Sequence, residues 1–263
     1  MTSTEAAILG AVQGLTEFLP ISSSAHLYVI PTMLGWKYAG LAFDVCLHWG
    51  TLFALVLAFW RDWFELVKNA FAREPQLRRE TWTTWLKLIA ATIPGAVAGL
   101  LLKDAAAGWL RSLPLQAVML LLFGFLLWWV DRVAPGRRDD RIPGWGTCMF
   151  IGVAQSLALV PGVSRSGVTM TAARVAGLGR ISAARFSFLL AAPITAGAGL
   201  FELRHLPPGL ERGPLMIGML SAMIVGLLAI RGLIRWLGRA GFGWFFAYRA
   251  LLASIILVYC VRH

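Results

Sequence analysis

The sequence predicts an all-α integral membrane protein with six spanning helices and two re-entrant helix hairpins, arranged as an inverted-topology repeat. The first observation behind this prediction is composition: 58% of the residues are hydrophobic and 14% are charged, whereas ordinary globular domains are about 25% charged. The second is a set of apolar runs of bilayer-spanning length. The third is a short polar sequence that occurs twice, each time inside apolar sequence.

The distribution of aromatic and basic residues agrees with this class. Many of the 12 Trp residues stand near the ends of apolar runs, as in the aromatic belts of membrane proteins. The net charge of +11 comes from basic residues in short loops between spans, so it indicates membrane orientation and anionic lipid rather than nucleic acid. Met1–Glu5 lacks the basic start of a signal peptide, so we expect the first apolar stretch to be retained.

The apolar runs predict which segments cross the bilayer, since about 20 apolar residues are needed. The expected spans are residues 39–60, 84–102, 115–130, 183–201, 214–234 and 244–261. Four further segments are too short to span alone, namely 5–18, 25–35, 144–160 and 165–178. Each short pair is broken at an elbow that contains Pro and Ser, which predicts a helix–turn–helix hairpin. Kinks are expected at Pro94-Gly95 and at Pro193.

The charges of the connecting segments predict the orientation. Basic residues are most frequent in 61–83, 131–143 and 231–243, which the positive-inside rule places in the cytoplasm. These segments can alternate correctly between the two sides of the membrane only if both short pairs are re-entrant. The first pair would then enter from outside and the second from inside. The chain is therefore expected to be one polytopic domain, 1–263, with inverted repeats at roughly 1–137 and 143–263.

The two elbows are related by a constant offset of 142 residues, which carries Gln13 to Gln155, Ser22 to Ser164 and Ser24 to Ser166. In lipid, such interruptions persist only where they are buried in protein or line a watery cavity. Matching broken segments in two halves of a membrane chain point to a binding site near the bilayer midplane.

The first elbow carries an acid, hydroxyls and an imidazole. Glu17 lies in apolar sequence, where a carboxylate costs about 2.5–3.5 kcal/mol, so we expect a base, a proton carrier or a metal ligand rather than an interfacial helix end. Ser22, Ser23 and Ser24 supply more hydroxyls than an N-cap needs, and a helix N-terminus binds anions. His26 is a candidate acid, base or nucleophile.

The second elbow supplies the positive charge. Arg165 stands between Ser164 and Ser166, and its planar fork suits a phosphate. The expected substrate-binding residues are Gln13, Ser22, Ser24, Ser164, Ser166 and Thr169. Together the two elbows predict a site for a phosphate carried on a lipid. A serine could attack it and be regenerated by water, while Glu17 or His26 handles the proton.

Three motifs closely resemble the undecaprenyl-diphosphate phosphatase family, also called bacitracin-resistance proteins. They occupy residues 13–26, 161–169 and 185–193. The resemblance implies a multi-pass enzyme of the bacterial inner membrane. Such an enzyme hydrolyses undecaprenyl diphosphate to undecaprenyl phosphate and phosphate, and so recycles the lipid carrier of cell-wall peptidoglycan synthesis. It further implies a site that opens to the outer face, and homodimer formation.

The resemblance also implies residue roles. It places the catalytic residues at Glu17, His26 and Arg165 and the nucleophile at Ser23, with a divalent cation, Mg or Ca, for which Glu17 is the candidate ligand. Some members carry a second Glu where this chain has Gln13. An amide offers only its oxygen, so a two-carboxylate metal site is not indicated.

Two other classes of protein could act on the same lipid. A transporter (flippase) of the polyprenyl phosphate could use the same midplane site, but it needs no nucleophile beside Arg165. A vanadate-haloperoxidase-like lipid phosphatase is excluded because the chain has no Pro-Ser-Gly-His motif. The residues alone leave the nucleophile open among Ser22, Ser23, Ser24, His26 and water.

Overall fold

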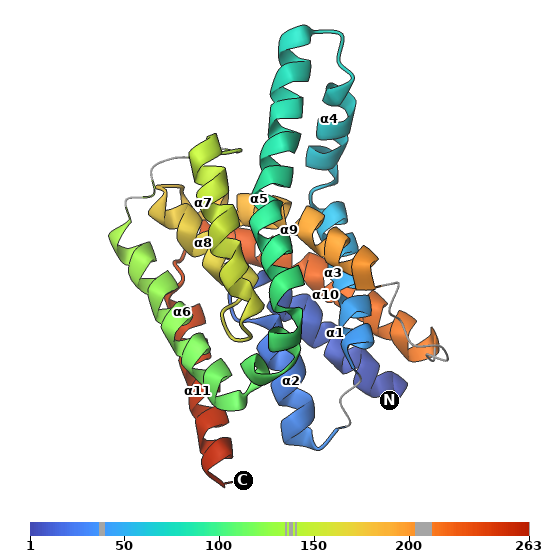
Figure 1. Ribbon diagram of the computed structural model, residues 1–263, viewed down its shortest axis with the longest axis vertical. Helices are drawn as coiled ribbons and strands as arrows, with labels where there is room; N and C mark the ends of the chain where they lie inside the picture. Colours follow the sequence, from blue (N-terminus) through green and yellow to red (C-terminus); the bar gives the residue numbers. More distant parts are fainter. Residues whose placement is uncertain (37–39, 135, 137–138, 140, 203–211, 263) are drawn as a thin grey trace.

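The computed structural model describes residues 1–36, 40–134, 136, 139, 141–202 and 212–262, and all regular structure in these ranges is helical. Figure 1 shows the helices packed into one bundle. The elements are α1 (Ser3–Phe18), α2 (Ser23–Leu34), α3 (Leu41–Ala58), α4 (Trp60–Ala70), α5 (Pro75–Ala107), η1 (Trp109–Arg111), α6 (Leu113–Val133), α7 (Trp145–Gln155), η2 (Ser156–Leu159), α8 (Arg165–Val175), α9 (Arg180–Glu202), α10 (Arg212–Leu237) and α11 (Gly243–Arg262).

Five of the six predicted spans are confirmed, and so is the multi-pass membrane class. Helices α5, α6, α9, α10 and α11 are each long and apolar enough to cross a membrane. A sixth crossing requires α3 and α4 together, and this pair is bent by 74°. The four short segments form α1, α2, α7 with η2, and α8. Residue 39, part of the loop 131–143 and most of the loop 202–213 lie outside the described residues.

The segment 61–83 was expected to be a loop, and this expectation is wrong. It contains α4 and the beginning of α5, which extend beyond the other helices in Figure 1. The two helices are joined by the indole groups of α5: Trp82 Nε1 donates to the carbonyl of Ala70 at 3.1 Å, and Trp85 Nε1 donates to that of Leu66 at 3.2 Å. The frequent charges of α4 belong to one face of an amphipathic helix.

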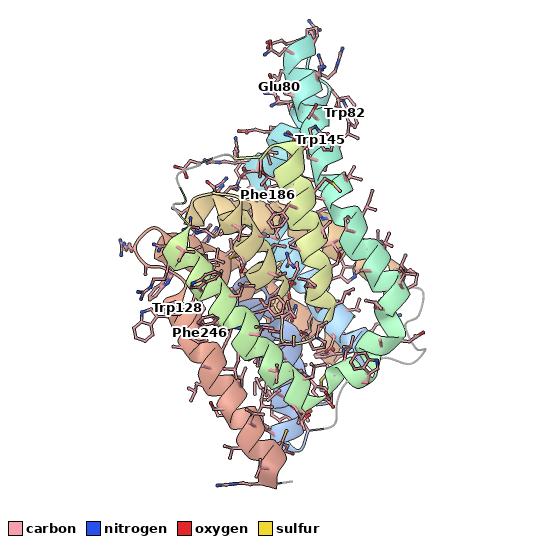
Figure 2. All side chains as sticks on the ribbon, turned by 60° about the vertical axis from the view of Figure 1, so that its left-hand side comes forward. Glu80, Trp82, Trp128, Trp145, Phe186 and Phe246 are labelled. Atoms are coloured by element: carbon pink, nitrogen blue, oxygen red, sulfur yellow. The ribbon has the colours of Figure 1, made fainter. Side chains whose placement is uncertain are left out.

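The longest helix presents large apolar side chains to the outside. Exposed residues recur on α5 every three or four positions, at Leu86, Ile89, Ile93, Val97 and Leu100. A water-soluble protein rarely exposes such a continuous apolar stripe, whereas lipid accepts it. Figure 2 shows Trp82 and Trp128 at the outside of the bundle and Phe186 within it. The helix continues through Pro94, as α9 does through Pro193, and the kinks expected there stay predictions.

Close helix contacts in both halves depend on glycine. Gly10 of α1 faces the backbone of Gly218 on α10, and Gly152 of α7 faces the backbone of Ala91 on α5. A Cβ atom on Gly152 would lie 2.7 Å from the Cα of Ala91. Gly10 and Gly152 are themselves 142 residues apart. Glycine at these two positions therefore allows α1 to pack against α10, and α7 against α5, with their backbones in contact.

We expect Gly152→Ala to lower the stability of the protein by about 1–3 kcal/mol, because the added methyl group meets rigid backbone. Thermal unfolding of the detergent-solubilised protein measures this change. Gly146→Ala is the matched control, since Gly146 lies on the same helix and a Cβ there meets nothing within 4 Å. Equal melting temperatures for the two variants would contradict the packing argument.

Candidate active site

The two elbows share an unusual backbone conformation. Ser22, just before α2, and Ser164, just before α8, both have φ of 73°. Among the described residues they are the only non-glycine positions with positive φ. Such a conformation costs on the order of 1–3 kcal/mol and persists only where the surroundings impose it. Both elbows are therefore held by strong local contacts.

These contacts join one elbow to the other. The backbone N–H of Gly162 donates to Ser22 Oγ at 3.2 Å, and Ser166 Oγ donates to the carbonyl of Leu19 at 3.1 Å. Ser164 Oγ caps α8 by accepting from the N–H of Gly167 at 3.2 Å. Polar backbone groups released by the chain breaks are thus satisfied within the protein, as an apolar environment requires.

Arg249 of α11 holds both elbows from behind. Its side chain is 0% exposed, and within the described part of the chain its guanidinium donates to backbone carbonyls alone. The acceptors belong to α6 and to both elbows: Met119, Leu120, Pro20, Gly162 and Val163. Sequence reasoning missed this residue. Its signal was a cation in the middle of the predicted span 244–261, since such residues are rare and seldom face lipid.

At the centre of the site, an ion pair connects the two halves of the chain. Arg165 donates to Glu17 Oε1 at 2.7 Å and also contacts the carbonyl of Ser187 at 3.4 Å. The other carboxylate oxygen of Glu17 accepts from Ser23 Oγ at 2.6 Å and from Gln13 Nε2 at 3.2 Å. Only 8% of the Glu17 side chain is exposed. A serine hydroxyl is thus held against a buried carboxylate that is neutralised by an arginine.

This group opens into a cavity of about 270 Å³. Among the predicted site residues, those that line the cavity are Glu17, Ser23, Ser24, Ser164 and Arg165. The cavity also has apolar walls, formed in part by Val45, Ala158, Leu159, Ile194 and Ala198. The cavity lining therefore combines charged and hydroxyl groups with apolar side chains, which suits an amphipathic ligand.

The other predicted residues support this cavity without being among its described lining. Gln13 donates to Glu17, and Ser22 accepts from Gly162 of the second elbow. Ser166 donates to the backbone of the first elbow. Thr169 Oγ1 contacts Ser187 Oγ at 2.7 Å and donates to the carbonyl of Arg165 at 2.8 Å. These side chains fix the position of Arg165 and Glu17.

His26 is not among the described residues that line the cavity. Its Nδ1 lies 2.7 Å from the carbonyl of Ser22, and its Nε2 lies 2.7 Å from the hydroxyl of Tyr248 on α11. A carbonyl can only accept, so Nδ1 carries a proton and Nε2 accepts from the tyrosine. With 3% of its surface exposed, the imidazole supports the strained serine. A direct catalytic role for His26 stays a prediction.

A second histidine, which the sequence reasoning missed, does line the cavity. His48 of α3 places Nε2 3.6 Å from Glu17 Oε2, and its side chain is 35% exposed. Its Nδ1 lies 2.7 Å from the carbonyl of Asp44, so this nitrogen donates and Nε2 is turned toward the cavity. Nothing in the local sequence distinguishes His48 from a structural polar residue within the predicted span 39–60.

The protein donors do not form a ready-made metal site. Both oxygens of Glu17 already accept hydrogen bonds, and Gln13 contributes its amide N–H rather than a carboxylate. In the described ranges, no group of three or more His, Cys, Asp or Glu residues is placed to hold a metal ion. The divalent cation that the resemblance implies stays a prediction, with Glu17 as the one acidic side chain among the described residues that line the cavity.

These features define the class of the protein: a polytopic helical membrane protein with an acid, an arginine and serine hydroxyls around an internal cavity. The sequence model of the family described as "Bacitracin resistance protein BacA" matches residues 6–255. The chain belongs to this family.

Named relatives extend over nearly the whole chain. An undecaprenyl-diphosphatase of Pelotomaculum thermopropionicum is 44% identical over 258 residues, which cover 98% of this chain and 97% of that protein. One from Moorella thermoacetica is 46% identical over 257 residues, with coverage of 98% and 97%. One from Gemmatimonas aurantiaca is 47% identical over 262 residues, with coverage of 97% of each chain.

We expect Arg249→Met to destabilise the protein by about 3–5 kcal/mol, because it leaves several buried carbonyl groups without donors. Arg231→Met is the control: Arg231 is exposed on α10, and its replacement is expected to change stability by less than about 0.5 kcal/mol. Thermal unfolding in detergent compares the two. An Arg249→Met protein as stable as the control would show that the guanidinium does not hold the elbows.

Proposed function

We propose that this chain hydrolyses undecaprenyl diphosphate to undecaprenyl phosphate and inorganic phosphate. The observation that carries the proposal is the contact of Ser23 Oγ with Glu17, 2.6 Å apart, beside Arg165 in a cavity lined by both polar and apolar side chains. The family relationship supports the same substrate. Its product is the lipid carrier of peptidoglycan synthesis, and recycling of that carrier accounts for bacitracin resistance.

In the proposed first step, Arg165 and the hydroxyls of Ser24 and Ser164 bind oxygens of the terminal phosphate. Ser23 Oγ attacks its phosphorus, and the bond to the bridging oxygen breaks. Undecaprenyl phosphate leaves with the electron pair. Glu17 accepts the proton of Ser23 and passes it to the leaving phosphate. Charge neutralisation by positioned donors is the main requirement of phosphoryl transfer.

In the second step, water attacks the phosphoserine. Glu17 accepts a proton from the water and returns one to Ser23 Oγ as inorganic phosphate departs. Ser23 is preferred over Ser22, because Ser22 is 1% exposed and already accepts from Gly162. Direct attack by a water held on Glu17 is the competing route, and it uses the same carboxylate.

We further propose the inverted repeat with two re-entrant hairpins. The helix contacts support it: α1 packs against α10 as α7 packs against α5, and α3 packs against α10 as α9 packs against α5. The remaining pair, α6 with α11, joins equivalent helices of the two halves. Each half therefore completes the packing of the other. A bacterial inner membrane with the site open to its outer face, and a homodimer, belong to the same proposal.

A divalent cation is proposed only as a companion of the substrate. Mg²⁺ commonly binds through one or two carboxylates together with substrate phosphates, and Glu17 is the available carboxylate. The hydrolysis steps above need no such ion. The transporter alternative is less well supported, since a carrier requires an anion site but has no use for the contact between Ser23 and Glu17.

We expect Arg165→Ala and Glu17→Gln each to reduce phosphate release by at least about 10²–10³-fold, because each removes a group that stabilises charge in the transition state. Release is measured from undecaprenyl diphosphate, or from farnesyl diphosphate, with purified protein in detergent. EDTA added to the wild type tests the cation. Ser156→Ala is the control, since Ser156 is not among the residues that line the cavity, and it should retain full activity. Full activity of Arg165→Ala would contradict the proposed phosphate contact.

The identity of the nucleophile has a separate test. Farnesyl diphosphate labelled with ³²P in the terminal phosphate is mixed with the enzyme and quenched in acid. A serine route leaves label on wild-type protein, and Ser23→Ala abolishes both label and turnover. Turnover by Ser23→Ala at a rate near that of the wild type would instead indicate direct attack by water.

A further inference from the structure

Gln155, at the end of α7, is a buried amide without a partner. It lines the cavity and is 3% exposed. Within the part of the chain that the structure describes, neither its Nε2 nor its Oε1 finds a hydrogen-bond partner. Leaving such a group unpaired costs about 1–3 kcal/mol, and buried polar groups are nearly always paired in folded proteins. This side chain therefore requires an explanation.

Comparison of the two elbows shows why the amide of Gln155 lacks the partner that Gln13 has. Gln155 is equivalent to Gln13, which donates from Nε2 to Glu17, four residues further on. Four residues after Gln155 stands Leu159, whose side chain cannot accept a hydrogen bond and which also lines the cavity. The second elbow thus keeps the donor but not its acceptor, which leaves the amide N–H available to a ligand.

The surroundings of the amide indicate which part of a ligand it meets. A Cβ atom on Gly95 of α5 would lie 3.2 Å from Gln155 Nε2 and 3.0 Å from Ile194 Cδ1. Ile194, Leu159 and Ala158 are apolar parts of the cavity wall. Glu17, Ser23 and Arg165, in contrast, contact one another at the reacting end. The amide accordingly lies beside apolar parts of the wall, in the same cavity as the charged and hydroxyl groups.

We infer that Gln155 is a substrate-binding residue whose Nε2–H donates to the lipid-linked phosphate of the diphosphate, the phosphate that the product retains. This inference rests on the proposed hydrolysis and deepens it. Of the two phosphates, only this one is bonded to the apolar chain, so it must lie where polar and apolar lining meet. An uncharged donor can bind its oxygens without competing with Arg165 for Glu17.

The test uses Gln155→Leu, which keeps the approximate size of the side chain and removes the amide. Apolar replacement of an unpaired buried amide is not expected to unfold the protein. The variant should raise both the KM for farnesyl diphosphate and the inhibition constant of farnesyl phosphate by about tenfold or more, the factor that corresponds to about 1.4 kcal/mol. The inhibition constant of inorganic phosphate, which mimics the departing group, should not change. Gln155→Glu should raise the KM further by repulsion.

Gln116→Leu is the matched control, because Gln116 is a fully buried amide on α6 that is not among the described residues lining the cavity. Its KM and inhibition constants should equal those of the wild type. Wild-type constants for Gln155→Leu, or a rise for inorganic phosphate as large as that for farnesyl phosphate, would overturn the inference.

A binding experiment tests this inference independently of the proposed hydrolysis. Titration calorimetry of farnesyl phosphate with wild type and Gln155→Leu measures the contact without turnover. Wild type that releases no phosphate contradicts the proposed function, whereas a tenfold loss of farnesyl phosphate affinity in Gln155→Leu still supports the contact. Equal affinities of the two proteins overturn the contact whether or not the wild type is active.

Discussion

Two interruptions of helical structure inside an apolar bundle impose the constraint on which this structure depends. Each interruption releases backbone N–H and C=O groups that lipid cannot satisfy. The protein meets this requirement by pairing one elbow with the other: Gly162 donates to Ser22, and Ser166 donates to Leu19. Arg249 satisfies carbonyl groups of both elbows from α11. The strained serines are stable only within this arrangement.

The same pairing creates the chemistry. Glu17 of the first elbow and Arg165 of the second meet at 2.7 Å, although they are 148 residues apart. The two elbow sequences differ at these points, since Leu159 stands 142 residues after Glu17 and Ser23 stands 142 residues before Arg165. One elbow therefore supplies the acid and the hydroxyl, and the other supplies the cation. Because the side chains of Glu17 and Arg165 are largely buried, their interaction is stronger than it would be in water.

Local pattern was sufficient for most of the secondary structure and insufficient for one segment. The apolar runs and Pro-Ser elbows located the spanning and short helices because length and hydrophobicity decide those elements. Helix α4 was missed because its charges, among them Arg61, Asp62 and Glu65, suggested a solvated loop. The apolar residues between them form one face of a helix, and that face stabilises the helix only by packing against α5.

The sequence by itself determined the membrane class, the two elbows, and the candidates Glu17 and Arg165, since charged groups in apolar sequence are costly and so mark a cavity. It left the choice among the serines open, and only the resemblance to a family pointed to Ser23. Only the tertiary structure decided which other side chains reach that cavity. His48 and Gln155 line it, while His26 turns to Tyr248, 222 residues away. The physical reason is that helical periodicity assigns each residue to a face of its own helix, whereas long-range packing decides what that face contacts.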